Sequence, residues 1–451
     1  FNYYFRRKTQ IKTNEIFLKM KILLTSFIIL IFFINNVYAE DHLKFYIESA
    51  FKNNLKLNAG RKKQKSIKQN LNISRSEFLP SISLSGNQSS TQSTNKSNQS
   101  GASLPDSNLD SETKTISVDQ KIFQGFKGYN SLKKSELEIK QADVELKQAE
   151  QQTILDTVSA YFDLIFKTKN QDFNLSNVNL FERQVESDNA RLQKGEITLT
   201  DLAQSESSLA GANANLIKAK TELLASKTNF ERITREKVPK SLNTNEKIEI
   251  SLPTSLNEAL KIAKLNNSNL LIAKLDYKIA EKELNIEKAR LSPSASINFS
   301  KSENKDYSST VDNLDEETVK ATITWPIIKG GENISSIKKS SFKKQRSFLL
   351  SKDAENKTIT ETTNSWSNYQ SSESVLKATK AQLKAAEIAN EGITLEYDSG
   401  NTRTTLEVIQ SRSLLLDARI AFAKAERDFM ISKVKLSFQL GTLSIRSINA
   451  L

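Results

Sequence analysis

The feature that most constrains this chain is an internal duplication with a period of about 200 residues. The segment Asp119–Ser135 reads DQKIFQGFKGYNSLKKS, and Thr324–Ser340, 205 residues later, reads TWPIIKGGENISSIKKS without a gap. The same offset joins Gly195 to Gly400, and beyond these glycines it becomes 206, so one residue is inserted near Asn401. A repeat of this length is too long for a short solenoid unit. We therefore expect one large hairpin-like unit, made twice.

The repeat sets the layout of the chain. Upstream of the matching segments the offset is 213, from Asn54 to Asn267 and from Pro80 to Pro293, so a Ser-rich segment is eight residues longer in the first copy. The expected parts are listed in chain order: an upstream extension (1–19), a signal peptide (20–39), repeat 1 (40–235), an equatorial connector (236–254), repeat 2 (255–441) and a C-terminal tail (442–451).

Long helical patterns fill most of each copy. The chain of 451 residues has only 12 Gly and 6 Pro, whereas roughly 32 and 23 are usual at this length. Apolar residues recur every seven positions, one row being Leu202, Leu209, Leu216, Leu223 and Phe230. Such a seam indicates helices packed side by side as in a coiled coil. We expect long helical hairpins over 126–235 and 331–440 that turn at 194–196 and 398–401, with short helices before each β-hairpin.

Two segments change from helical to strand spacing. Ala295, Ile297 and Phe299 alternate with polar residues, as do Ile116 and Val118 in the first copy, which predicts β-hairpins over 80–124 and 293–328. One apolar and one polar face fits a soluble sheet, or a sheet with lipid outside and water inside. Four strands cannot close a barrel, and lipid does not tolerate open edges. If the strands span a membrane, several chains must share one barrel.

The N-terminal region has the pattern of an export signal. From Met20 the chain reads MKILLTSFIILIFFINNVYAE, with a basic start, a 13-residue apolar stretch and a small residue at Ala39. This apolar stretch is shorter than the ~20 residues of a spanning helix. A buried or spanning helix is the alternative. We expect the mature chain to start at Glu40, which lowers the formal net charge from +13 to about +8 on the same residue counting.

The composition leaves few reagents for catalysis. Zero Cys excludes disulfides and thiolate zinc sites, and a single His makes a His-based triad a poor fit. The glycines at 125–128 do not form a phosphate loop. We expect no enzyme activity, no catalytic residue, no cofactor and no metal site. The excess of basic residues raises the possibility of nucleic-acid binding, but lysines alternate with acids along the helices, which is typical of a solvated face.

An ordered set of motifs, present in both copies, resembles the TolC-like outer membrane efflux proteins from about residue 40 to 442. The motifs are Asn54-x-x-Leu57 and Asn267-x-x-Leu270, Leu79-Pro80 and Ser292-Pro293, Ile328-Lys329-Gly330-Gly331, two hairpin tips at 195–202 and 397–408, and Leu440-Gly441-Thr442.

The resemblance implies a mainly α fold with β. Three chains would form a 12-stranded β-barrel in the outer membrane, continuous with a 12-helix periplasmic α-barrel. It also implies a passive conduit for efflux or type I secretion. The implied partners are two further copies, outer membrane lipid, a periplasmic adaptor (membrane fusion) protein and an inner-membrane RND, ABC or MFS transporter, with no nucleic acid.

The resemblance also places a gate and a docking surface at the hairpin tips. Tyr397 and Arg403 would bond Thr200 and Asp201 across the tips, and Glu407 would supply a ring of carboxylates. The family's second acidic ring falls on Gln410, which is not acidic. The residues placed at the adaptor-docking tips are Gly195, Leu199, Gly400 and Leu406.

Two alternatives accompany this interpretation. Thr198-x-x-Asp201 and Thr404-x-x-Glu407 are also the pattern of capping boxes at helix starts, so these acids can serve the fold as well as a gate. For the whole chain, the alternative is a periplasmic coiled-coil adaptor or structural protein. Such a protein would have one long hairpin and Gly-rich β-domains, whereas this sequence predicts two hairpins and has few glycines.

Overall fold

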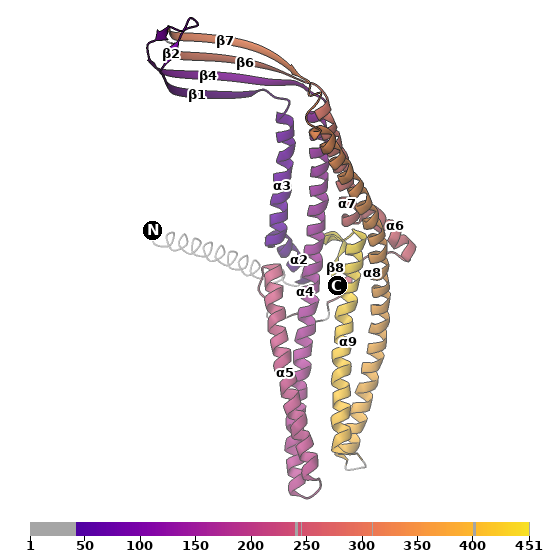
Figure 1. The fold of residues 1–451 in the computed structure, drawn as a ribbon. Coiled ribbons are helices and arrows are strands. Elements are labelled where there is room, and N and C mark those ends of the chain that lie inside the picture. Colours follow the sequence, from indigo (N-terminus) through magenta and orange to yellow (C-terminus); the bar gives the residue numbers. More distant parts are fainter. Residues whose placement is uncertain (1–41, 240–241, 245, 309, 400–402, 451) are drawn as a thin grey trace, which may run out of the picture.

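The computed structural model describes residues 42–239, 242–244, 246–308, 310–399 and 403–450 (Figure 1). The expected signal peptide and upstream extension lie outside these residues. The described chain is elongated, with a sheet at one end and the tips of two helical hairpins at the other. Shorter helices and the connector surround its middle.

Four long helices carry the duplication most clearly. They are α4 (Lys127–Gln193), α5 (Leu199–Thr234), α8 (Glu332–Asp398) and α9 (Thr405–Leu440). Both α4 and α8 have 67 residues, and both α5 and α9 have 36. Their bounds differ by 205 for the first pair and by 206 for the second, the two offsets found in the sequence. At 1.5 Å per residue, each 67-residue helix is roughly 100 Å long.

Shorter helices flank the upper half of these rods. They are α2 (His42–Asn53), α3 (Leu55–Ser76), α6 (Leu256–Asn266), α7 (Ser268–Lys288) and the 3-10 turn η1 (Ala289–Leu291). The Asn residues of the repeated Asn-x-x-Leu motif cap α3 and α7, because Asn54 and Asn267 each accept a hydrogen bond at 3.1 Å from the backbone N–H of the Leu three residues later. Their side-chain amides donate to the ends of α5 and α9, at Ile233 O and Gln439 O.

A four-stranded antiparallel sheet joins the two copies. Its strands are β1 (Ser81–Ser93), β4 (Ser107–Gln124), β6 (Ser294–Ser308) and β7 (Val311–Thr324), in the order β1-β4-β6-β7. The loop of the first hairpin carries the short pair β2 (Lys96–Ser97) and β3 (Ser103–Leu104). At the end of the sheet, the N-caps of α4 and α8 are left-handed, at Phe126 (φ 66°) and Gly331 (φ 80°). The glycine at 331 adopts this conformation without strain and so allows the chain to turn from strand to helix.

The largest apolar core lies at mid-height, where the connector crosses the helices. Its largest fully buried side chains include Tyr161 and Phe230. The connector adds β5 (Ile248–Glu249), which pairs with β8 (Asn449–Ala450) after the 3-10 turn η2 (Ile445–Ser447). Glu246 anchors the connector because its buried carboxylate accepts hydrogen bonds from the backbone N–H of Leu43 and from the Tyr161 hydroxyl. Among the described helices, none has a stretch long and apolar enough to cross a bilayer.

Candidate functional site at the hairpin tips

The tip of the first hairpin is a tight turn followed by a reciprocal cap. After α4 the chain turns at Gly195, whose φ is 74°. Thr198 Oγ1 accepts from the backbone N–H of Asp201, and the Asp201 carboxylate accepts from the backbone N–H of Thr198 at 2.9 Å. Hydrogen bonds from the Thr198 side chain and then from its backbone lower the pKa of Asp201. The capping-box interpretation of this motif is confirmed.

The second tip repeats the cap and adds a cation. Thr404 and Glu407 form the same reciprocal box at the start of α9. Arg403 donates to Glu396 at 2.6 Å and to Glu407 at 3.0 Å. The backbone N–H of Thr404 and then the Arg403 side chain lower the pKa of Glu407. The expected tip residue Gly400 lies outside the described residues.

The expected bonds across the tips are not formed within this chain. Arg403 instead binds two acids of its own hairpin, Glu396 seven residues before it and Glu407 four residues after it. Thr200 is exposed, and Asp201 bonds to Thr198. The remaining expected residues are at the surface as well: Gln410 is exposed, Leu199 is 70% exposed and Leu406 is 40% exposed.

Tyr397, also expected at the gate, does bridge the two hairpins, but its partner is Asp188 rather than Thr200 or Asp201. Its ring is buried, and its hydroxyl donates at 3.2 Å to Asp188 on α4. Asp188 is fully buried and also accepts from Gln184 at 2.9 Å and from Ser205 of α5 at 2.6 Å. The Tyr397 hydroxyl lies 3.1 Å from the Thr405 hydroxyl. One carboxylate thus joins α4, α5 and α8 about two helical turns above the first tip.

One arginine, Arg412, completes this buried cluster, and a second, Arg191, lies beside it. Arg412 of α9 donates to the Gln184 side-chain oxygen at 2.9 Å, so α9 is joined to α4 as well. Burial lowers the pKa of the Arg412 guanidinium, against the opposing effects of nearby acids, of which Asp398 is the largest. The guanidinium of Arg191 lies 4.6 Å from the centre of the Tyr397 ring. We call Gln184, Asp188, Ser205, Tyr397, Thr405 and Arg412 the inter-hairpin cluster.

Of this cluster, only Tyr397 was predicted from the sequence. Asp188 lies seven residues after Phe181, and Gln184 seven after Asn177, so both occupy the buried seam of α4. A polar residue at a seam position was the available signal, since such positions are otherwise apolar. Directly above the cluster, Val178, Phe181 and Ile409 pack together in an apolar patch, although Asn174 and Asn177 are also buried on this part of α4.

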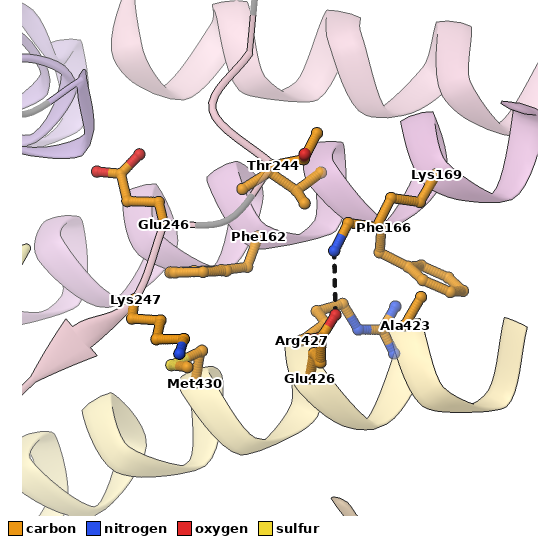
Figure 2. A pocket seen from close by; sticks show the side chains of 11 residues that line it. Phe162, Phe166, Lys169, Thr244, Glu246, Lys247, Ala423, Glu426, Arg427 and Met430 are labelled. Carbon is orange, nitrogen blue, oxygen red and sulfur yellow. Dashed lines mark hydrogen bonds and ion pairs between the residues drawn. The ribbon is translucent and has the colours of Figure 1, made fainter. Parts of the chain in front are cut away.

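A separate cavity lies at mid-height, between α4, α9 and the connector (Figure 2). Its volume is about 290 Å³, and Phe162, Phe166 and Met430 supply much of its apolar lining. Lys169 points across the site to Glu426, and the two form an ion pair at 3.0 Å. Arg427 stacks over Phe166 at 4.7 Å and pairs with Asp163. Lys169 and Arg427 therefore already have partners. The cavity lies where α4 of the first repeat meets α9 of the second.

In the part of the chain that the structure describes, no group of three or more His, Cys, Asp or Glu residues is placed to hold a metal ion. The inter-hairpin cluster is a small set of hydrogen bonds that joins the two hairpins near their tips.

Comparison with known proteins agrees with this geometry. The chain matches the family described as "Outer membrane efflux protein" over residues 46–234 and 259–442, one segment in each copy. It is 24% identical over 397 residues to the outer membrane efflux protein BepC of Brucella suis, covering 88% of this chain and 84% of that protein. It is 22% identical to the outer membrane protein TolC of Escherichia coli, covering 85% and 78%.

Among solved structures, the chain is similar to the Campylobacter jejuni CmeC outer membrane channel. The TM-score is 0.78 at 16% identity, and the match covers 89% of this chain and 85% of that one. This similarity concerns the fold, and it confirms the predicted combination of long helices with a β-sheet.

Proposed function

The chain belongs to the outer membrane efflux protein family and is a protein of the outer membrane, and we propose that three copies of it form one exit duct. The observation that carries this proposal is the open sheet. Within the described chain, β1 and β7 are edge strands, and large apolar side chains on the sheet are exposed, among them Leu84 (77%) and Ile323 (78%). Lipid accepts such a sheet only if its edges are closed. Three copies would supply twelve strands.

The helices support the same assembly. In the lower half, the packing order is α5-α4-α9-α8 (Figure 1), which leaves one side of α5 and one side of α8 without a neighbour in this chain. Both helices carry exposed apolar residues: Ile217 and Leu224 on α5 are each 66% exposed, and Ile388 and Leu395 on α8 are 62% and 63% exposed. Packing α8 of one copy against α5 of the next would bury these residues and close a tube of twelve helices.

The duct is passive in this proposal. Substrates for efflux or type I secretion are pushed through by an energised inner-membrane transporter of the RND, ABC or MFS class, and a periplasmic adaptor docks at the hairpin tips. Exposed Leu199 and Leu406, one on each tip, supply apolar contacts for that adaptor. The exposed apolar sheet disfavours the alternative of a soluble adaptor or structural protein, because such a surface would aggregate in water.

The gate in this proposal lies at the tips. The inter-hairpin cluster holds the two helical hairpins of one chain together, and opening requires its hydrogen bonds to be exchanged or broken. Three Glu407 carboxylates, one from each copy, form a ring at the constriction. Arg403 lies 3.0 Å from Glu407, so the ring includes a compensating cation.

The assembly is tested on protein extracted from outer membranes in mild detergent. We expect light scattering to give three times the chain mass and planar bilayers to show discrete conductance steps. Val319→Asp places a charge on the apolar face of β7 and should abolish membrane assembly. Its matched control, Thr318→Asp, places the same charge on the opposite face and should assemble. A monomer that stays in the soluble fraction and conducts nothing would overturn the proposal.

A further inference from the structure

The strand register shows which residues share the apolar face of the sheet. Residues directly opposite each other on paired strands point to the same side. Ile82 pairs with Val118, Val118 with Phe299, and Phe299 with Val319. These four residues therefore form one row across all four strands, and every second residue along each strand belongs to the same face. We call it the outer face.

Near the helices, the rows of the outer face are apolar. One row contains Ala295 and Ile323, the next Ile297 and Ala321, and the third is the four-residue row described above. Leu84 and Ile116 extend the apolar area on β1 and β4. Gln120 is the polar exception, and its side-chain amide donates to the backbone oxygens of Phe78 and Lys121 at 3.3 and 2.9 Å. We call these rows the apolar band.

Farther from the helices, the same face becomes charged. On β6 and β7 the row after Phe299 and Val319 is the ion pair between Lys301 and Glu317, at 3.0 Å, whereas the same row is still apolar on β4 and β1, at Ile116 and Leu84, so it is the boundary between the two bands. Two further rows follow, and their residues are Lys114, Glu303 and Asp315, then Glu112, Lys305 and Asn313. Within these rows, Lys114 and Glu112 form an ion pair at 2.7 Å. We call the three rows the charged band.

The inner face shows no such change over the same rows. Opposite the charged band it carries mainly hydroxyl and amide side chains such as Thr113, Thr115, Ser302 and Asn304, which bond to one another across β4 and β6, and Glu316 is the charged residue that pairs with Ser302 in these rows. The charges of both signs therefore gather on the outer face, at the end of the sheet far from the helices.

The apolar band has the height of a thin membrane core. On β4, from Ile116, which lies in the row of the Lys301–Glu317 pair, to the end of the strand at Gln124, the chain advances eight residues, or roughly 27 Å at about 3.4 Å each. At a strand tilt of about 40° this corresponds to roughly 20 Å of height, close to the ~25 Å apolar band of outer membrane barrels. From Glu317 to Val311, β7 continues for another six residues, so the sheet also reaches well beyond the band.

We infer that the lipid hydrocarbon ends at the Lys301–Glu317 pair, and that the charged band and the strands beyond it stand outside the membrane core as a collar in contact with water and headgroups. This inference rests on the proposed membrane-spanning assembly and adds where that assembly sits in depth. It assigns the collar, including the polar β2–β3 loop, to the cell surface.

The test uses the absence of cysteine from the natural sequence, because each single-Cys variant then has one labelling site. Phe299→Cys and Val319→Cys report on the apolar band, and Lys305→Cys and Asp315→Cys report on the charged band. Each variant is labelled with an environment-sensitive fluorophore in detergent and reconstituted as the full assembly into phosphatidylcholine vesicles with brominated acyl chains.

We expect the brominated chains to quench the two apolar-band labels strongly and to leave the two charged-band labels unquenched. Equal quenching at Lys305 and Phe299 would overturn the inference while leaving the membrane assembly intact. Loss of quenching at all four positions would instead contradict the membrane-spanning assembly itself. Trimer mass in light scattering, measured for each variant, shows that the substitution has not disturbed folding.

Discussion

At the scale of single residues, the fully buried carboxylate of Asp188 is the main connection between the two hairpins near their tips. It accepts hydrogen bonds from Gln184, Ser205 and Tyr397, which lie on three different helices. In Asp188→Asn one acceptor oxygen becomes a donor, so at least one buried donor loses its partner. Leaving a buried group unsatisfied costs about 1–3 kcal/mol.

We therefore expect Asp188→Asn to loosen the lower ends of α4 and α8, which hydrogen–deuterium exchange would detect as faster exchange there. The matched control is Asp172→Asn, an exposed carboxylate on the same helix, which should leave exchange unchanged. Equal exchange in both variants would mean that the cluster does not hold the hairpins together.

Gly441 is a second residue whose role depends on one contact. It ends α9 in the left-handed region, at φ 72°, with its Cα against the carbonyl group of Asn266. A Cβ at this position would collide with that carbonyl, and the conformation itself costs a non-glycine residue about 1–2 kcal/mol. We expect Gly441→Ala to lower the thermal unfolding midpoint of the detergent-extracted protein clearly.

The repeat supplies the control for this prediction. The position equivalent to Gly441 in the first copy is Arg235, which adopts φ 62° with a side chain in place. Arg235→Ala keeps the strain and should change stability by no more than about 0.5 kcal/mol, as exposed substitutions usually do. If Arg235→Ala and Gly441→Ala lower the midpoint equally, the close approach to Asn266 is not what requires glycine.

At the scale of elements, the capping boxes make the starts of α5 and α9 sensitive to pH. The pKa values of Asp201 and Glu407 are both lowered by hydrogen bonds in the folded chain. A carboxylate with a lowered pKa stabilises the fold above its unfolded pKa, near 4, and that stabilisation is lost as the pH falls through the lower folded value. We expect both helix starts to fray below about pH 4.

Protection factors from hydrogen exchange test this expectation, because they correct for the intrinsic rate at each pH. In Asp201→Asn the first turn of α5 should lose its pH dependence, while the first turn of α9 keeps it. Unchanged pH dependence at α5 in this variant would assign the effect to other groups.

The elements were predictable where their residues follow a period. The repeat offsets anticipated equal helix lengths in the two copies, and alternation located the strands because each strand of the sheet has one apolar and one polar face. The pairing of β5 with β8 was not predictable, since two short strands 200 residues apart leave no periodic signal. Asp188 was missed for the opposite reason: it follows the seven-residue period, but its side chain is polar.

At the scale of the whole molecule, one chain alone does not complete the barrel, the helical tube or the gate of the proposed duct. The sheet has two open edges, the rods have two free sides, and the tips of one chain present a single Glu407. In the proposed trimer, a pore property such as ion preference would depend on a residue that is present three times. A substitution of one charged residue at the tip would then change three charges at the constriction, although each chain loses or gains only one.

The ring proposal predicts opposite effects for two neighbouring substitutions. Glu407→Ala removes three carboxylates and should weaken the cation preference of single channels in planar bilayers and their block by multivalent cations, because charge rings set ion preference in narrow pores. Glu407 is also a cap, so this variant alone could act through the fold.

Gln410→Glu is the matched variant that adds a carboxylate, since Gln410 is exposed one turn farther along α9 and its substitution leaves the cap intact. It should add a second ring and strengthen cation preference and multivalent block. Unchanged selectivity in both variants would remove Glu407 from the pore and leave it the capping role alone.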